Sequence, residues 1–375
     1  METSPLPSLK PGVQPLDTGV TDDLNRAVQA VVRNKYLMDV AVADHGASML
    51  ARDLHDGGLG PHEPLPFLCH ILPFYRACER VDDGTPTYEF ALVPTSNTLG
   101  CSWRWRRTSL SESDLESCRD RLTDFVAMAD GKVDDATYAW VKPLGIFAPC
   151  EGKNRVDFFR EEGIESIPAR VFEWTYPEAS RIEIYDVKKG GFSGVWAVLD
   201  GRWVEPVPNP TWTLPLLRAY GAKTAERWPA SFPEPEQVQL AFFQRPGTTS
   251  PLGNPDFGEV PVADLHTIMA IQNFKSQPVR IAPIEMRHVK IDHRVWLFSL
   301  AAALIACVLL VALPSQWTDA RVIAGIALGS ALAVGVTPYM VPFMTTKRGA
   351  LAKGSFLPLS LAPKAAHQKT RRSLG

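Results

Sequence analysis

The clearest stretch of residues with the types and spacing for ligand chemistry begins at Cys150 and reads CEGKNRVDFFREEGIESIPARV. Gly152 follows a short apolar run, and Lys153, Asn154 and Arg155 stand where an amphipathic helix is expected to begin. The first turn of a helix has unpaired amides and the positive end of the helix dipole. A phosphate would accept backbone hydrogen bonds there and a charge-assisted bond from Arg155, and Gly152 would permit close approach. An ordinary solvated turn with a charged helix start is the alternative.

Several predicted elements must position this turn. Ser111 and Asp114 form a capping-box-like start for a helix that Gly131 closes. A short second helix is expected around DDATYAW (134–140), followed by one buried strand, VKPLGIFAP (141–149). After the turn, a helix ending at Gly163 leads to a strand, SIPARVFEW (166–174). The predicted order is therefore helix, strand, glycine turn, helix, strand.

The joint pattern over about residues 111–174 resembles the ParB/sulfiredoxin family. The resemblance implies an α+β, ParB/sulfiredoxin-like mixed α/β domain whose Gly-x-x-Arg turn holds nucleotide phosphates: CTP in ParB proteins, and ATP or ADP in sulfiredoxins. By position, Gly152 and Arg155 match that turn, and Asn154 replaces the usual His. Lys153 stands where sulfiredoxins have their catalytic Cys, so sulfinic-acid repair is not expected, because an amine cannot replace a thiol nucleophile there.

The same resemblance makes Glu151 a candidate Mg²⁺ contact beside a bound CTP, ATP or ADP. If the domain is enzymatic, nucleotide hydrolysis or phosphoryl transfer is the expected class, with no catalytic residue identified. The Glu-Asn-x-x-Arg segment and helix-turn-helix module of ParB proteins are not evident in the sequence, which disfavours chromosome partition. No zinc-like spacing of Cys and His predicts a structural metal.

Two other functions stay open. One is a non-catalytic, membrane-tethered protein-interaction module, favoured by the replaced His and Cys positions. The other is a DNA-binding or nuclease-like ParB relative. The chain carries −2 overall, and seven cations after Met344 without an acid leave the region before Val295 at a formal charge of about −9. An acidic body is a poor partner for nucleic acid.

The strongest signal is a transmembrane hairpin at 295–344, with uncharged apolar runs at 295–313 and 322–344. A pair of buried helices in a soluble core is the alternative. Cations flank both outer ends, so the positive-inside rule predicts an inner (cytoplasmic) membrane protein, multi-pass, with both termini cytoplasmic. Gly325, Gly329 and Ala333 form a small-residue line, which favours packing of the hairpin on itself over a homo-oligomer through the second span.

The remaining sequence divides by composition. We expect a Pro-rich mobile N-terminus (1–20), an N-terminal α+β region (21–110), the ParB/sulfiredoxin-like domain (111–222), a Pro/Gly-rich connector (223–294) and, after the hairpin, a basic cytoplasmic tail (345–375). The alternating WRWRR (103–107) is read as a strand, and QVQLAFFQ (237–244) as an isolated strand within the connector. The expected partners are the lipid bilayer, a nucleotide and a protein.

Overall fold

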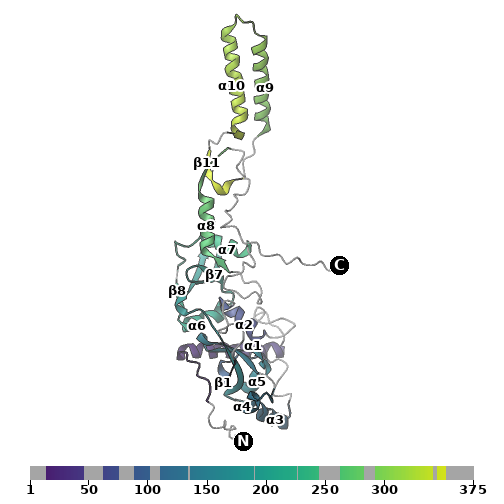
Figure 1. Cartoon of the computed structure of the whole chain (residues 1–375), viewed down its shortest axis with the longest axis vertical. Helices are drawn as coiled ribbons and strands as arrows, with labels where there is room; N and C mark the ends of the chain where they lie inside the picture. Colours follow the sequence, from purple (N-terminus) through teal and green to yellow (C-terminus); the bar gives the residue numbers. More distant parts are fainter. Residues whose placement is uncertain are drawn as a thin grey trace, which may run out of the picture. The chain divides into compact units, whose positions relative to one another are not determined.

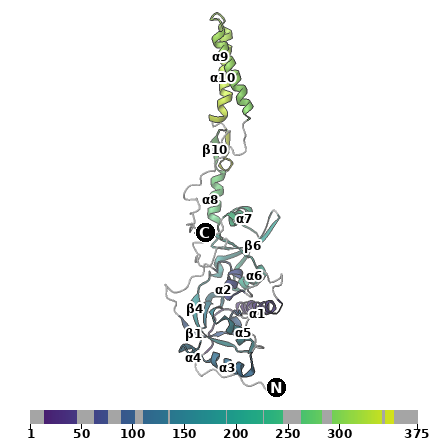
Figure 2. The ribbon, with the colours of Figure 1, turned by 90° about the vertical axis from the view of Figure 1, so that its right-hand side faces the viewer.

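The computed structural model groups the chain into two units, residues 1–265 and residues 266–375. Figures 1 and 2 show the ribbon from two sides, coloured along the sequence. The structure describes residues 14–45, 62–75, 88–101, 110–133, 136–189, 191–225, 227–244, 262–282, 292–340 and 344–351. The WRWRR stretch and most of the predicted N-terminus and basic tail lie outside these described residues. Within them the protein is mixed α/β with two apolar helices near its C-terminus.

A four-stranded sheet in the order β1-β4-β2-β3 forms the centre of the first unit. Its strands are β1 (Glu89–Pro94), β2 (Thr137–Val141), β3 (Ile146–Glu151) and β4 (Ser166–Trp174). β4 pairs antiparallel with β1 and parallel with β2, and β3 is antiparallel to β2. Thr98 bridges Phe147 of β3, and Pro15 bridges Leu92 of β1, so short segments cover the two edge strands.

Helices cover both faces of this sheet, and the pleat of β2 shows why. Ala139 and Val141 belong to a core cluster with α1 and α2, whereas Tyr138 and Trp140 belong to a second cluster with α5. Successive strand side chains point to opposite faces, so two cores need two layers of helix. The helices of the first unit are α1 (Asp22–His45), α2 (Pro64–Ile71), α3 (Glu112–Thr123), α4 (Phe125–Ala129), α5 (Lys153–Glu161), α6 (Pro210–Tyr220) and α7 (Pro235–Gln244).

A second sheet, in the order β8-β5-β6-β7-β9, completes the first unit. Its strands are β5 (Ile182–Lys189), β6 (Phe192–Leu199), β7 (Trp203–Pro206), β8 (Lys223–Ala225) and β9 (Ala263–Asp264). An Asp-Gly pair between two runs of alternating apolar residues predicts a two-residue hairpin between β6 and β7. The hairpin is present, but Leu199 pairs with Trp203, so its loop contains Asp200, Gly201 and Arg202; Asp200 and Gly201 have φ of 55° and 64°. Because β8 and β9 belong to this sheet, the stretch predicted as a connector contributes to the folded unit.

The second unit contains α8 (Leu265–Ser276) at its start, β10 (Pro278–Ile281), the helices α9 (His293–Ala312) and α10 (Thr318–Met340), and β11 (Met344–Lys347). The apolar windows of α9 and α10 have mean hydropathies of 2.7 and 1.7 and are only 17% and 6% buried. A helix pair in a soluble core would be buried, so this exposure argues against that alternative. Both helices are long and apolar enough to cross a membrane, and membrane association follows from them.

The two apolar helices pack on each other, as predicted, but not through the predicted line of Gly325, Gly329 and Ala333. The contact line of α10 contains buried Ala324 and half-buried Gly335, whose added Cβ would lie 3.4 Å from Ser299 of α9. Gly325 and Gly329 are exposed, and a Cβ on either would meet nothing within 4 Å. Successive residues of a helix are rotated by about 100° about its axis, so Gly325 points away from α9 although Ala324, one position earlier, is buried.

Four further expectations were wrong in detail. Residues 137–141 form strand β2 rather than a helix, because Thr, Tyr and Trp favour a pleated surface and alternate between two cores. QVQLAFFQ lies in helix α7, whose first position is Pro235 and whose Val238 is fully buried. The predicted strand 141–149 is interrupted by a 3₁₀ turn with Gly145 at φ 64°, and the helix expected from Ser111 to Gly131 divides at Asp124.

The 3₁₀ helices are short connectors at element ends. They are η4 (Thr95–Asn97), η6 (Lys142–Leu144), η7 (Ala179–Arg181) and η10 (Arg348–Ala350). η4 leads the chain from the edge strand β1 to Thr98, which bridges β3. On the way it contacts both α1 and α5, the two helices that form the site described below.

Candidate functional site

The predicted glycine turn lies between strand β3 and helix α5. Gly152 is the N-cap residue of α5 and has φ 79° and ψ 17°, a left-handed conformation that glycine adopts without steric cost. The amide of Arg155 donates to the Gly152 carbonyl over 3.0 Å, which closes the first turn. The order strand, glycine turn, helix, strand is therefore present, with the α5 amino end directly after the last residue of β3.

The structure brings the five predicted site residues into this one turn, with different exposures. Glu151 and Asn154 are exposed, and Gly152 and Lys153 are half-buried. Arg155 is 8% exposed. The Arg155 guanidinium thus lies within the fold beneath the first turn of α5, instead of on the surface where the sequence pattern placed it.

The two cations of the turn have protein groups as neighbours. The Lys153 ammonium is ion-paired with Glu63, the residue that precedes α2. Arg155 acts electrostatically on the Tyr138 hydroxyl: burial raises the pKa of Tyr138, and the Arg155 charge opposes that rise. The Lys153 side chain is still 32% exposed beside Glu63, whereas Arg155 is buried.

A buried ion pair on α1 lies close to the same region. Lys35 donates to Asp39 over 2.5 Å, and their side chains are 1% and 2% exposed. Burial raises the pKa of Asp39 to about 7, because loss of solvation outweighs the attraction of the Lys35 ammonium. The Lys35 ammonium also stands 5.4 Å from the centre of the Phe67 ring.

A second ion pair on α5 joins this cluster. The Arg160 guanidinium donates to Asp157 over 2.6 Å and to the carbonyl of Thr98 over 2.8 Å. Asp157 is 2% exposed, and a Cβ added at Gly100 would lie 2.0 Å from its Oδ1 atom. Glycine is therefore the residue that lets the chain after η4 pass against this carboxylate. Asp157 and Arg160 act on the Asp39 carboxyl with opposite signs.

Cys101 is the thiol of this cluster. Its side chain is buried, and burial raises its pKa to about 11. At neutral pH it is a protonated thiol, which is a poor nucleophile. Its backbone amide donates to the Lys153 carbonyl over 3.4 Å, so the charge cluster and the glycine turn are directly connected.

The charge cluster has a signal in the sequence that the motif analysis missed. The buried stripe of α1 contains Leu24, Val28, Val31, Val32, Lys35, Asp39 and Val42. A lysine and an aspartate thus occupy apolar-stripe positions, four residues apart, where each can neutralise the other. Helical spacing alone could have identified this pair, whereas its link to Asp157 and Cys101 required the fold.

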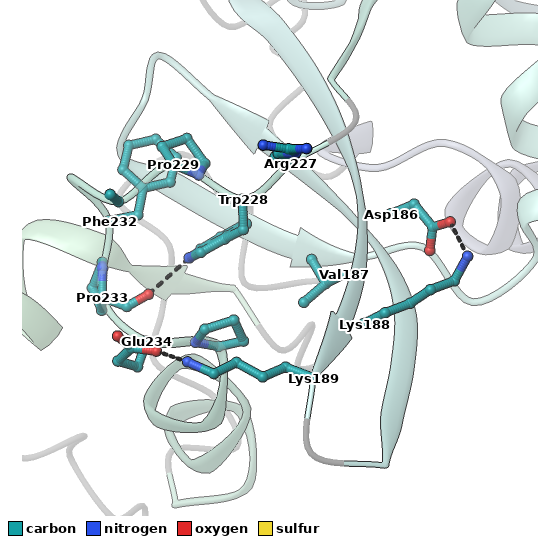
Figure 3. A pocket seen from close by; sticks show the side chains of 12 residues that line it. Asp186, Val187, Lys188, Lys189, Arg227, Trp228, Pro229, Phe232, Pro233 and Glu234 are labelled. Atoms are coloured by element: carbon teal, nitrogen blue, oxygen red, sulfur yellow. Dashed lines mark hydrogen bonds and ion pairs between the residues drawn. The ribbon is translucent and has the colours of Figure 1, made fainter.

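A groove and a pocket lie in the described part of the first unit, and residues 151–155 line neither of them. A groove of about 840 Å³ lies between α1, the β1–η4 junction and the end of α5, and Arg33, Tyr36 and Arg160 contribute to its lining. A pocket of about 470 Å³ lies beside β5 and includes Arg227 and Trp228. Figure 3 shows that in this pocket Lys188 is held by Asp186, Lys189 by Glu234, and the Trp228 ring N–H by the Pro233 carbonyl.

In the described residues, no three His, Cys, Asp or Glu side chains are grouped to hold a metal ion. This finding does not test a magnesium ion bound with a nucleotide, which takes one or two carboxylates and completes its shell with phosphates and water. Comparison with known proteins adds no relative: no family model, no curated protein and no solved structure matches this chain.

Proposed function

We propose that this protein is a membrane-anchored, ParB/sulfiredoxin-like domain that binds a phosphate-bearing ligand, a nucleotide in the first instance, at the turn between β3 and α5. The observation that carries the proposal is Gly152, which caps α5 in a left-handed conformation with two cations in the turn that follows. In this proposal the amino end of α5, with the positive end of the helix dipole, faces an incoming anion.

In this proposal the cations have different roles. Lys153, whose side chain is 32% exposed, reaches the phosphate by exchanging its contact with Glu63. Arg155 adds positive potential from beneath the first turn, because charge in a poorly solvated position acts over a longer range than on the surface. Asn154 is exposed and offers an amide donor, and Glu151 provides a carboxylate for Mg²⁺. If turnover occurs, nucleotide hydrolysis or phosphoryl transfer is the class to assay.

The membrane arrangement is part of the same proposal. α9 and α10 are the two spans of an inner-membrane hairpin, and the first unit and both termini are cytoplasmic. The cationic residues outside both spans support this orientation through the positive-inside rule. A free cysteine introduced at Gln316, between the spans, should react with an impermeant thiol reagent only from outside the cell.

Thermal unfolding of the full chain in detergent tests the ligand proposal. CTP, ATP and ADP with Mg²⁺ are added separately, and a true ligand at 100 times its Kd raises stability by about 2.7 kcal/mol. Gly152→Val should abolish this rise, since a β-branched residue does not adopt the turn and its side chain approaches the phosphate position. Lys153→Ala should reduce it.

Gly163→Ala is the matched control, because Gly163 follows the other end of α5 with φ 69° and open space around it. This variant carries a similar backbone strain and should keep the ligand-induced rise. A rise of equal size in wild type and Gly152→Val would place binding elsewhere. No rise with any of the three nucleotides would refute the proposal.

A second candidate function is a membrane-tethered interaction module without ligand. The specific observation in its favour is the engagement of both cations, with Lys153 paired to Glu63 and Arg155 buried. In that case Lys153→Ala changes stability slightly and nucleotides have no effect. Nucleic-acid binding, the third alternative, would show as salt-sensitive gel retardation, against the acidic charge of the region before Val295.

A further inference from the structure

Unit two contains a small amphipathic sheet made by the segments on either side of the membrane hairpin. β10 and β11 pair antiparallel, with Arg280 opposite Thr345 and Pro278 opposite Lys347. These four residues are exposed, whereas Val279 and Ile281 on β10 are half-buried and buried. The pleat therefore places Arg280 and Lys347 on the same, outer face of the sheet.

The described residues of the second unit near the sheet are 266–282 and 344–351, and they contain no Asp or Glu. The cations of the outer face therefore have no acidic partner among these residues. Arg280 and Lys347 are diagonal neighbours, which lie about 7–8 Å apart in an antiparallel pair. A third cation, Lys275 at the end of α8, is exposed, and its Cβ would lie 3.4 Å from a Cβ added at Gly349. We call Lys275, Arg280 and Lys347 the basic face.

Contacts with α8 hold this sheet in place. The Arg348 amide donates to the Gln277 carbonyl over 2.9 Å, and the Arg348 guanidinium stands 4.4 Å from the centre of the Phe274 ring. The Arg348 side chain thus packs within the fold and is not counted in the basic face. Figures 1 and 2 show the sheet directly after α8 along the chain.

Chain length keeps the basic face close to the membrane surface. Lys347 is seven residues beyond Met340, the last residue of α10, and an extended residue spans at most about 3.6 Å. Lys347 is therefore within about 25 Å of the end of the second span. Asp292, an acid at this end of the hairpin, caps α9 by accepting a bond from the Arg294 amide over 2.9 Å.

We propose that the basic face is a binding site for anionic phospholipid headgroups of the bilayer that α9 and α10 span. Two cations about 7–8 Å apart can contact one phosphodiester from both sides or two neighbouring headgroups. A negatively charged leaflet attracts juxtamembrane cations, and the attraction falls off within a Debye length, so only cations near the surface benefit. The site is independent of the nucleotide proposal.

Lipid selectivity of the full chain tests this site. Purified protein in detergent is titrated with phosphatidylglycerol or phosphatidylcholine, and bound lipid is counted by native mass spectrometry. Wild type should bind phosphatidylglycerol preferentially, and R280Q with K347Q should weaken that binding about 25-fold, or about fivefold for each cation. Phosphatidylcholine binding should stay unchanged.

The control R321Q with K223Q removes two exposed cations elsewhere, one in the first turn of α10 and one on β8. This variant should bind phosphatidylglycerol as wild type does, and melting curves confirm that both proteins are folded. Equal affinities of wild type and R280Q/K347Q, or an equal loss in the control, would overturn the proposal. So would displacement of the lipid by glycerol phosphate at the same concentration, since the site would then recognise free phosphate.

Discussion

In the first unit α1 buries an ammonium and a carboxylate against each other, whereas in the second unit β10 and β11 turn two cations outward with no acid among described residues 266–282 and 344–351. Lys35 is 1% exposed and its partner Asp39 lies one helical turn away. Arg280 and Lys347 are exposed on a sheet of only two strands. A cation that the fold neutralises contributes to the fold, and a cation that it leaves exposed is available to an external anion.

Asp39→Ala should have the largest effect of any single change in this comparison. It leaves the Lys35 ammonium buried without its carboxylate, which costs about 3–5 kcal/mol. Asp23→Ala removes the partner of exposed Arg26 on the same helix and should cost about 1 kcal/mol or less. Urea unfolding at pH 8 measures the free energy of unfolding of both variants. Similar losses of stability would mean that burial does not distinguish the Lys35–Asp39 pair from the Arg26–Asp23 pair.

Gly100→Ala should cost about 1–3 kcal/mol, because its Cβ would overlap the Asp157 carboxylate and displace it from Arg160. A double-mutant cycle with Asp157→Ala checks the cause. Gly100→Ala should destabilise the Asp157→Ala variant less than it destabilises wild type, because the carboxylate that its Cβ would overlap is no longer there. Additive costs in the double variant would contradict this explanation.

The free energy of unfolding should depend on pH because of the buried Asp39 carboxyl. The pKa of Asp39 is raised from 3.8 to about 7 in the folded state, so the folded chain binds the proton more tightly than the unfolded chain. This contribution to stability is present below pH 4 and is lost as the pH rises to about 7, by at most about 1.4 kcal/mol per pH unit. Lys35→Met with Asp39→Leu should remove that slope while retaining the fold, and an unchanged slope would assign it to another group.

Lys347→Gln should have the smallest effect on stability, within about 0.5 kcal/mol of wild type, as for other exposed positions. Lys347→Gln should instead weaken the binding of phosphatidylglycerol, whereas Asp39→Ala lowers the stability of the fold. Thermal unfolding in a neutral detergent measures the first quantity. A loss as large as that of Gly100→Ala would show that Lys347 stabilises the fold.

The sequence predicted those features that depend on local pattern. Strand β4 has its predicted bounds, the Asp200–Gly201 turn joins β6 to β7, and Gly152 opens a helix that ends before Gly163. Each of these depends on a few adjacent residues, since positive φ favours glycine and strand pairing favours alternation. Residues 137–141 were assigned to a helix because a five-residue run carries too little periodicity to separate the two states.

The two long apolar helices near the C-terminus, the glycine turn and the start and end of most elements were determined by the sequence itself, because apolar length and backbone preference are properties of neighbouring residues. Tertiary structure alone decided that Arg155 is buried, that Asp157 and Cys101 lie near Lys35 and Asp39, and that Gly325 is exposed beside a buried Ala324. The reason is physical: which side of an element is buried depends on partners that are distant in the chain.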